Sequence, residues 1–212
     1  MTDLFLNRIH YPVTTLGPGR RVGIWVQGCT IGCDGCVAKD TWATDYTSPV
    51  KVTAILEWLD SVDDVTGITI SGGEPFQQAP AVAELLLGIH EWRAGRPIDV
   101  LVYSGYPLSL LRRDASARRV LTLCDAVLTG PYVARRTTDE PWRGSSNQRL
   151  VPLTPLGEDR YRTVPPDGPR LQAVQDGNRL WFIGIPNPGE MDHIADHLTK
   201  TGITYTTTTW RT

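Results

Sequence analysis

Short apolar runs rich in β-branched residues alternate with helical patterns along the first two-thirds of the chain. Four such runs are present: Val22–Val26, Gly67–Ile70, Asp99–Tyr103 and Asp125–Leu128. Each is bounded by glycine or polar residues, which is typical of strands in a parallel sheet buried on both faces. Apolar residues recur at helical spacing between them, over residues 50–59, 81–92 and roughly 108–121. This alternation predicts right-handed strand–helix–strand crossovers and an α/β fold.

The last third of the chain has a different pattern. Residues 151–169 are rich in proline and glycine, which predicts a long surface connection. Further elements are expected in this order: a hairpin of Leu171–Val174 and Arg179–Ile183 around the turn Asp176-Gly177, a helix from Glu190 to Lys200 that stops at Gly202, and a closing strand over Ile203–Thr209. At 212 residues, one domain is the default expectation. We therefore expect a core over residues 1–150 and a C-terminal extension over residues 151–212, packed on the core and not independent.

Three of the four cysteines fall in one short segment directly after the first predicted strand: Cys29, Cys33 and Cys36. This clustering indicates a metal or cluster site more than a disulfide framework. The alternative is a helix that presents three small apolar residues on one face. Interspersed glycines at positions 28, 32 and 35 disfavour that helix and favour a loop whose backbone can curl around a cluster.

Thiolates are suitable ligands for either an iron–sulfur cluster or zinc. A structural zinc site normally has four protein ligands, and only Cys124 or a histidine could complete one here. A cubane cluster held by three thiolates instead leaves one iron without a protein ligand. The amine and carboxylate of S-adenosylmethionine (SAM) can bind that iron, and electron transfer from the cluster then cleaves SAM to a 5′-deoxyadenosyl radical. Both metal readings stay open at this point, with the cluster favoured.

A second motif, Ser71-Gly72-Gly73-Glu74-Pro75, follows the second predicted strand. The carboxyl ends of parallel strands meet at one edge of a sheet, so this motif should lie beside the cysteines. Glycines admit a close approach of the backbone, and the Glu74 carboxylate can accept hydrogen bonds from an ammonium group. The alternative reading is an ordinary strand-to-helix turn.

The Cys-x3-Cys-x2-Cys spacing resembles the signature of the radical SAM superfamily, and Gly72–Pro75 resembles its Gly-Gly-Glu-Pro motif. Other segments are similar to the activating enzymes of anaerobic ribonucleotide reductase: Gly17–Arg20, Trp25–Cys29, Gly35–Trp42, Tyr103–Tyr106, Asp125–Gly130 and Arg143–Arg149. The resemblance spans about residues 7–151. It implies that residues 1–150 form a radical SAM core, a partial (βα)6-type barrel with parallel strands, and that the hairpin and helix belong to the extension.

The resemblance also implies the roles of individual residues. Cys29, Cys33 and Cys36 would hold a [4Fe–4S] cluster, and Gly72, Gly73 and Glu74 would line the SAM site. Ser104 would bind the SAM carboxylate or ribose, with an ordinary strand-end hydroxyl as the alternative. Asn147 would serve SAM or the partner, with a role in structuring its loop as the alternative. No catalytic residue is assigned beyond the cluster and the SAM site.

The implied activity is abstraction of a hydrogen from a backbone glycine of a large glycyl radical enzyme. The cluster would receive its electron from a donor such as flavodoxin or ferredoxin. Four residues depart from the family pattern, Ile31, Val37, Ala38 and Thr129, and the shortest activases have no counterpart of the chain after Arg149. Two alternatives are therefore kept: a radical SAM enzyme that modifies a peptide or small metabolite directly, and a non-catalytic zinc or iron–sulfur binding module. The Gly-Gly-Glu-Pro segment counts against the binding module.

The net charge of −2 gives no electrostatic reason to expect nucleic acid or an anionic membrane as a partner. The first residues lack a basic region followed by an apolar stretch, and no apolar run is long enough to cross a bilayer. We therefore expect a cytoplasmic protein.

Overall fold

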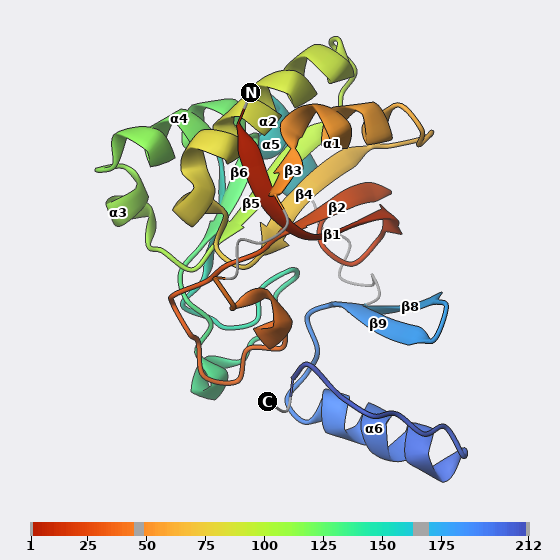
Figure 1. Cartoon of the computed structure of the whole chain (residues 1–212). Helices are drawn as coiled ribbons and strands as arrows, with labels where there is room; N and C mark the ends of the chain where they lie inside the picture. Colours follow the sequence, from red (N-terminus) through yellow and green to blue (C-terminus); the bar gives the residue numbers. More distant parts are fainter. Residues whose placement is uncertain (1, 45–48, 163–169, 211–212) are drawn as a thin grey trace.

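The computed structural model describes residues 2–44, 49–162 and 170–210, and it shows a mixed α/β fold built on one seven-stranded sheet (Figure 1). The strand order is β3-β1-β2-β4-β5-β6-β7. The strands are β1 (Asp3–Val13), β2 (Arg21–Val26), β3 (Pro49–Lys51), β4 (Gly67–Gly72), β5 (Asp99–Ser104), β6 (Ala126–Thr129) and β7 (Arg149–Pro152).

The central strands β2, β4, β5 and β6 are parallel to one another, and these are the four strands that the sequence predicts. Antiparallel strands flank them, because β1 pairs with β2 and β3, and β7 pairs with β6. The sheet ends at β3 and β7, so the described residues form no closed barrel. The α/β prediction with a parallel sheet is confirmed, whereas the (βα)6-type barrel is not.

Helices cover one face of the sheet (Figure 1). They are α1 (Val52–Leu59), α2 (Ala79–Arg93), α3 (Leu108–Leu111) and α4 (Ala115–Leu123). The first two match the predicted helices closely. The third predicted helix is broken, because the Asp114 side chain accepts a hydrogen bond from the Ala117 N–H at 2.7 Å and starts α4 anew.

Alternation along the parallel strands divides their side chains between the two faces of the sheet. Ile24, Ile70 and Val102 pack against the helices in the main core. Leu101 and Leu128 point to the opposite side, which we call the second face of the sheet, and pack there against Tyr161. Tyr161 belongs to α5 (Pro155–Arg162).

A buried ion pair lies on the second face near the amino ends of the parallel strands. The Arg21 guanidinium donates to both carboxylate oxygens of Asp99, at 3.0 and 2.8 Å, and both side chains are fully buried. The Tyr161 hydroxyl donates to the same carboxylate at 2.5 Å. This pair therefore fastens α5 to the sheet, at the end opposite to the cysteines.

The prediction of a surface connection over residues 151–169 is wrong for its described part. β7 continues to Pro152 and α5 follows, with Tyr161 only 7% exposed. Proline and glycine mislead here, because Pro155 occupies the first turn of α5 and Gly157 packs where a Cβ would meet the Asp125 carbonyl oxygen at 2.0 Å. Residues 163–169 lie outside the described part of the chain.

The predicted hairpin and helix are confirmed as β8 (Leu171–Asp176), β9 (Arg179–Gly184) and α6 (Glu190–Lys200). Gly202 follows α6 with φ +84°. The closing strand over residues 203–209 is wrong: these residues contain no strand, and Ile203 and Tyr205 are 50% and 40% exposed. Threonine favours strands, but this segment pairs with no strand of either sheet.

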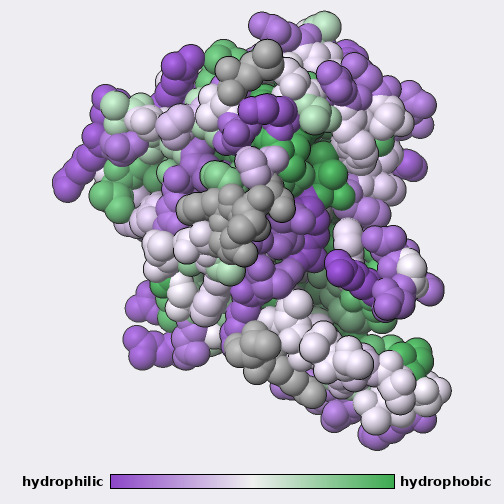
Figure 2. All heavy atoms as spheres, in the orientation of Figure 1, coloured by the Kyte–Doolittle hydropathy of each residue, from purple (hydrophilic) through white to green (hydrophobic). Residues whose placement is uncertain are grey.

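The β8–β9 hairpin packs over the second face of the sheet. Ile183 contacts the cluster that contains Val13 and Leu16, with Trp25 and Tyr103 at its edge. Gln172 donates to the Pro12 carbonyl oxygen at 2.7 Å. Figure 2 shows hydrophobic side chains in the region between this hairpin and α6, while most of the visible surface is hydrophilic. The division into a core and an extension at residue 150 remains a prediction.

In the described parts of the chain, no helix combines the length and the apolar character needed to cross a membrane.

Candidate functional site

The three clustered cysteines lie in a loop, residues 28–42, that leaves the carboxyl end of β2. We call it the cysteine loop. Gly28, Gly32 and Gly35 have φ angles of +99°, +61° and +76°, which other residues rarely adopt. The segment 28–38 contains no helix, so the alternative of three cysteines on one helix face is wrong.

The base of the cysteine loop is closed by backbone hydrogen bonds. The Gly28 N–H donates to the Thr41 carbonyl at 2.8 Å, and the Cys29 N–H donates to the Trp42 carbonyl at 3.1 Å. Gln27 adds a side-chain bond from Nε2 to the Ala43 carbonyl at 2.7 Å. These bonds join residues 27–29 to residues 41–43, and we call these two paired segments the neck of the loop. The second half of the loop, which leads back to the neck, includes a 3₁₀ turn, η1 (Lys39–Thr41).

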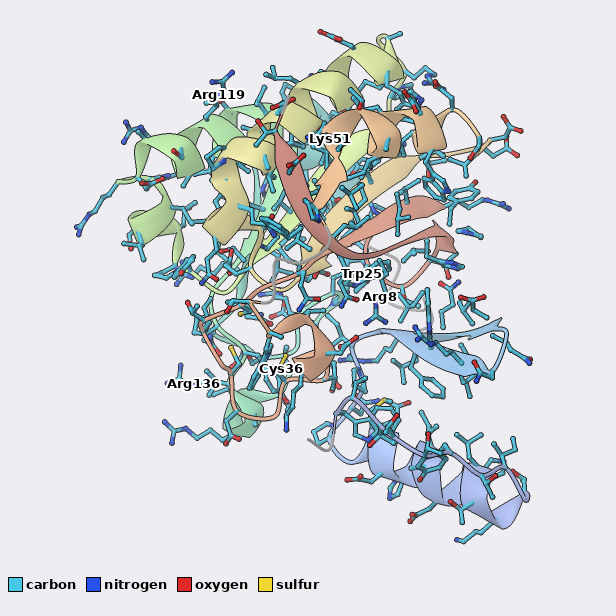
Figure 3. The ribbon with its side chains drawn as sticks, viewed as in Figure 1. Arg8, Trp25, Cys36, Lys51, Arg119 and Arg136 are labelled. Carbon is cyan, nitrogen blue, oxygen red and sulfur yellow. The ribbon has the colours of Figure 1, made fainter. Side chains whose placement is uncertain are left out.

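Cys29, Cys33 and Cys36 are partly exposed, whereas Cys124 is only 1% exposed. Figure 3 labels Cys36 in the cysteine loop, below the sheet as drawn. Burial raises the pKa of Cys29 and Cys33, and the neighbouring thiols raise it further. The backbone near each thiol opposes this rise in pKa, at Ile31 and Gly32 for Cys29 and at Tyr132 for Cys33.

This donor set fits a cluster held by three thiolates. It supplies three soft, partly exposed thiols on one loop. Within residues 2–44, 49–162 and 170–210, however, no group of three or more cysteine, histidine, aspartate or glutamate side chains is arranged so that it could hold a single metal ion. The zinc alternative needs a fourth ligand, and Cys124 is buried in the main core.

The Gly-Gly-Glu-Pro segment lies directly against the start of the cysteine loop. The Gly73 N–H donates to the Val26 carbonyl and the Glu74 N–H donates to the Gly28 carbonyl, both at 2.8 Å. A Cβ at Gly73 would stand 2.2 Å from the Gly28 oxygen, so only glycine fits there. The sequence predicts this proximity of the two motifs, and the structure places them together.

The Glu74 carboxylate is buried and accepts hydrogen bonds from three groups of the protein. Oε1 accepts from the Phe76 N–H at 3.0 Å and from the Ser104 hydroxyl at 2.9 Å. Oε2 accepts from the Gly105 N–H at 2.7 Å. Burial raises the pKa of Glu74 to about 7, although these three donors act to lower it. Glu74 thus ties the segment after β4 to the segment after β5.

Ser104 and Asn147, the two less specific candidates, both make contacts within the protein. The Ser104 oxygen accepts from the Tyr106 N–H at 3.0 Å in addition to its bond to Glu74. Asn147 Nδ2 donates to the Pro131 carbonyl at 2.8 Å, which supports the loop-structuring reading. Its Oδ1 is buried without a hydrogen-bond partner in the described structure. Asn147 therefore keeps one acceptor for a further group.

Gln77 is a site residue that the sequence analysis missed. Its Nε2 donates to the Thr30 hydroxyl at 2.7 Å and to the Tyr106 hydroxyl at 2.8 Å. It therefore joins the cysteine loop to the segment after β5, in parallel with Glu74. The available signal was its place in the turn η2 (Pro75–Gln78), directly after the Gly-Gly-Glu-Pro segment.

Comparison with known proteins agrees with this geometry. Residues 15–151 match the model of a 4Fe-4S single cluster domain family. The chain is 34% identical over 149 residues to the anaerobic ribonucleoside-triphosphate reductase-activating protein of Salmonella typhi, covering 66% of this chain and 93% of the relative. The chain belongs to the family of anaerobic ribonucleoside-triphosphate reductase-activating proteins. Proteins of the same name from Escherichia coli K12 and Enterobacteria phage T4 are 32% and 29% identical, over 93% and 85% of their lengths.

Family membership confirms the predicted cofactors, a [4Fe–4S] cluster and SAM, and the prediction of an activating enzyme of the radical SAM type. The family model ends at residue 151, close to the predicted end of the core. The β8–β9 hairpin and α6 lie beyond it.

Proposed function

We propose that this protein forms a glycyl radical on a large partner enzyme of the anaerobic ribonucleotide reductase type. The observation that carries the proposal is the hydrogen-bonded assembly of the cysteine loop, the Gly-Gly-Glu-Pro segment and the segment after β5 at the carboxyl ends of β2, β4 and β5. Family membership supports it, because the relatives are named as activating proteins of that reductase. We also infer that the open sheet corresponds to part of a radical SAM barrel.

Cys29, Cys33 and Cys36 are the proposed cluster ligands, and SAM is proposed to bind between the cysteine loop and Gly72–Gly73. When bound, the cluster and SAM supply a 5′-deoxyadenosyl radical, the species that removes a hydrogen atom from the substrate glycine. Gly72 and Gly73 present only backbone there, so a ligand can approach the chain closely. Glu74 holds the segment after β4 beside the end of β5 through its hydrogen bonds to Ser104 and Gly105. Ser104 acts mainly through Glu74.

Glu74 has a positioning role in the proposed SAM site. Three donors of the protein already orient its carboxylate, two at Oε1 and one at Oε2, and the residue is 1% exposed. An ammonium group bound beside it would add a charge-assisted bond to a carboxylate that the fold has already oriented. We therefore propose that Glu74 fixes the shape of the SAM site as well as contributing an acceptor to it.

Two further parts of the proposal concern the setting of the reaction. A low-potential donor such as flavodoxin or ferredoxin would reduce the cluster, and the protein would work in the cytoplasm. Reduction of the cluster by one candidate donor in place of dithionite, followed by the rate of SAM cleavage, tests the first point.

The test of function uses the reconstituted protein, SAM, a reductant and the purified partner reductase under anaerobic conditions. The expected result is a glycyl radical signal in the partner by electron paramagnetic resonance, with one 5′-deoxyadenosine formed per radical. Cys33→Ala is the matched inactive control, and Cys124→Ala is the matched active one. SAM cleavage without a partner radical would instead favour direct modification of a peptide or small molecule.

A further inference from the structure

Trp181 of β9 lies over the guanidinium group of Arg8 in β1. The Arg8 Cζ atom is 5.3 Å from the centre of the Trp181 ring, a cation–π geometry. The ring also contacts His10 edge to face, with ring centres 6.1 Å apart. Figure 3 shows Arg8 between the sheet and the β8–β9 hairpin. Trp181 is therefore the aromatic side chain through which the C-terminal hairpin contacts Arg8 and His10 of β1.

Arg8 connects this contact to the cysteine loop. Its guanidinium group pairs with the carboxylate of Asp40, which lies in the η1 turn of that loop. Both side chains are 24% exposed, so water screens the pair only in part. Asp40 directly precedes Thr41, whose carbonyl accepts the Gly28 N–H at the neck of the loop.

A second set of hydrogen bonds joins Arg8 to the same neck. Arg8 Nε donates to Asn7 Oδ1 at 2.6 Å, and Asn7 Nδ2 donates to Gln27 Oε1 at 2.7 Å. Gln27 Nε2 then donates to the carbonyl oxygens of Asp40 at 3.3 Å and Ala43 at 2.7 Å. Arg8 thus holds η1 of the loop through its ion pair with Asp40. It also orients the side-chain amides of Asn7 and Gln27.

We propose that Arg8 is a positioning residue for the cysteine loop, and that the C-terminal extension sets its position through Trp181. An arginine side chain has many rotamers, and each contact that restricts them favours the one that meets Asp40. Trp181 restricts Arg8 from the side opposite to the loop. Both Arg8 and the hairpin lie outside residues 15–151, the segment that the family model matches.

The proposal rests on the proposed function only in that the cysteine loop is the cluster loop. The primary test needs neither cluster nor activity, so the two can fail separately. It measures how fast an alkylating reagent modifies each cysteine of the apo-protein, resolved by peptide mass spectrometry. Cys29, Cys33 and Cys36 report opening of the loop, and the buried Cys124 reports global unfolding in the same molecule.

Arg8→Gln and Trp181→Leu should each speed modification of the loop cysteines by roughly three- to tenfold. Cys124 should stay protected in both. Arg8→Lys keeps the charge and Trp181→Phe keeps the ring, so both should restore most of the protection. Because both residues act through one contact, the double variant should react no faster than Arg8→Gln alone. Arg20→Gln is the matched control, because it removes a second cation–π contact, in which the Arg20 Cζ atom lies 5.6 Å from the centre of the Tyr11 ring.

Reconstituted protein gives the second readout. Arg8→Gln should alter the electron paramagnetic resonance spectrum of the reduced cluster, and Arg8→Lys should restore it. Unchanged loop reactivity and an unchanged spectrum in Arg8→Gln would overturn the positioning role. Additive effects of Arg8→Gln and Trp181→Leu would overturn the link to the extension. If Cys124 is modified faster in the variants by the same factor as the loop cysteines, the variants unfold globally. That result would also contradict the proposal.

Discussion

The Ser104 hydroxyl donates a hydrogen bond to Oε1 of Glu74 at 2.9 Å, and so joins the end of β5 to the segment after β4. Both side chains are buried, at 5% and 1% exposure. Ser104 is also the acceptor for the Tyr106 N–H. One hydroxyl therefore bonds both a buried carboxylate and a part-buried backbone N–H.

Ser104→Ala should destabilise the protein by about 1 to 3 kcal/mol, because it leaves the buried Glu74 carboxylate and the part-buried Tyr106 N–H each one bond short. Urea denaturation of the apo-protein measures this loss. Ser61→Ala is a suitable control, since Ser61 makes only a local bond to the Trp58 carbonyl at an exposed helix end. A loss no larger than that of the control would show that the Glu74–Ser104 bond does not stabilise the site.

The pH dependence of stability should carry a contribution from Glu74. Its pKa is raised from 4.5 in the reference state to about 7 in the folded state. Between these values the unfolded chain has released a proton that the folded chain still holds, so stability falls as pH rises from 4.5 to 7 and this contribution is constant above 7. The fall amounts to at most about 3 kcal/mol.

Other carboxylates add their own slopes, so the measurement compares wild type with Glu74→Gln across the same pH range. As pH rises from 4.5 to 7, the unfolding free energy of wild type should fall relative to that of Glu74→Gln. Parallel curves over that range would mean that the pKa of Glu74 is not raised.

Tyr161→Phe tests how firmly α5 is held to the sheet. The hydroxyl donates to the buried Asp99 carboxylate, which is the partner of Arg21. Hydrogen bonds to buried charged groups contribute about 1.5 to 3 kcal/mol, so the variant should lose roughly that much stability. Tyr205→Phe, at an exposed position in the extension, should lose almost none. Equal losses in both variants would contradict the role given to Tyr161.

The cysteines divide into two classes with opposite expected behaviour. Cys29→Ala, Cys33→Ala and Cys36→Ala should each remove most of the iron and sulfide bound after anaerobic reconstitution. Cys124→Ala should bind the cluster normally, because burial in the main core raises the pKa of that thiol to about 12 and keeps it protonated. Iron and sulfide analysis with visible absorbance measures this. Loss of iron in Cys124→Ala would contradict the three-ligand assignment.

Sequence patterns predicted the parts of this fold that local chemistry determines. The four parallel strands are continuous apolar runs, and the Asp176-Gly177 turn specifies its hairpin by backbone geometry alone. β1 was missed because register shifts between Leu6 and Arg8, and between His10 and Val13, break its alternation. β3 and β7 are short edge strands that owe their form to pairing with a neighbour.

The candidate site shows the same division. Cysteine spacing and the Gly-Gly-Glu-Pro segment are local signals, and both motifs were found from sequence. Gln77, Arg8 and Trp181 were not, because their roles depend on contacts between segments far apart in the chain. The threonine-rich end of the chain shows the opposite error, since strand propensity cannot form a strand without a partner edge.

Transfer of deuterium from the partner shows whether this protein abstracts a hydrogen atom from a glycine of the reductase. The partner reductase is prepared with glycine deuterated at Cα and incubated with the reconstituted protein, unlabelled SAM and reductant. The proposed hydrogen abstraction should give 5′-deoxyadenosine that carries one deuterium, formed together with the glycyl radical signal in the partner. Unlabelled 5′-deoxyadenosine, produced at the same rate with and without the partner, would contradict it.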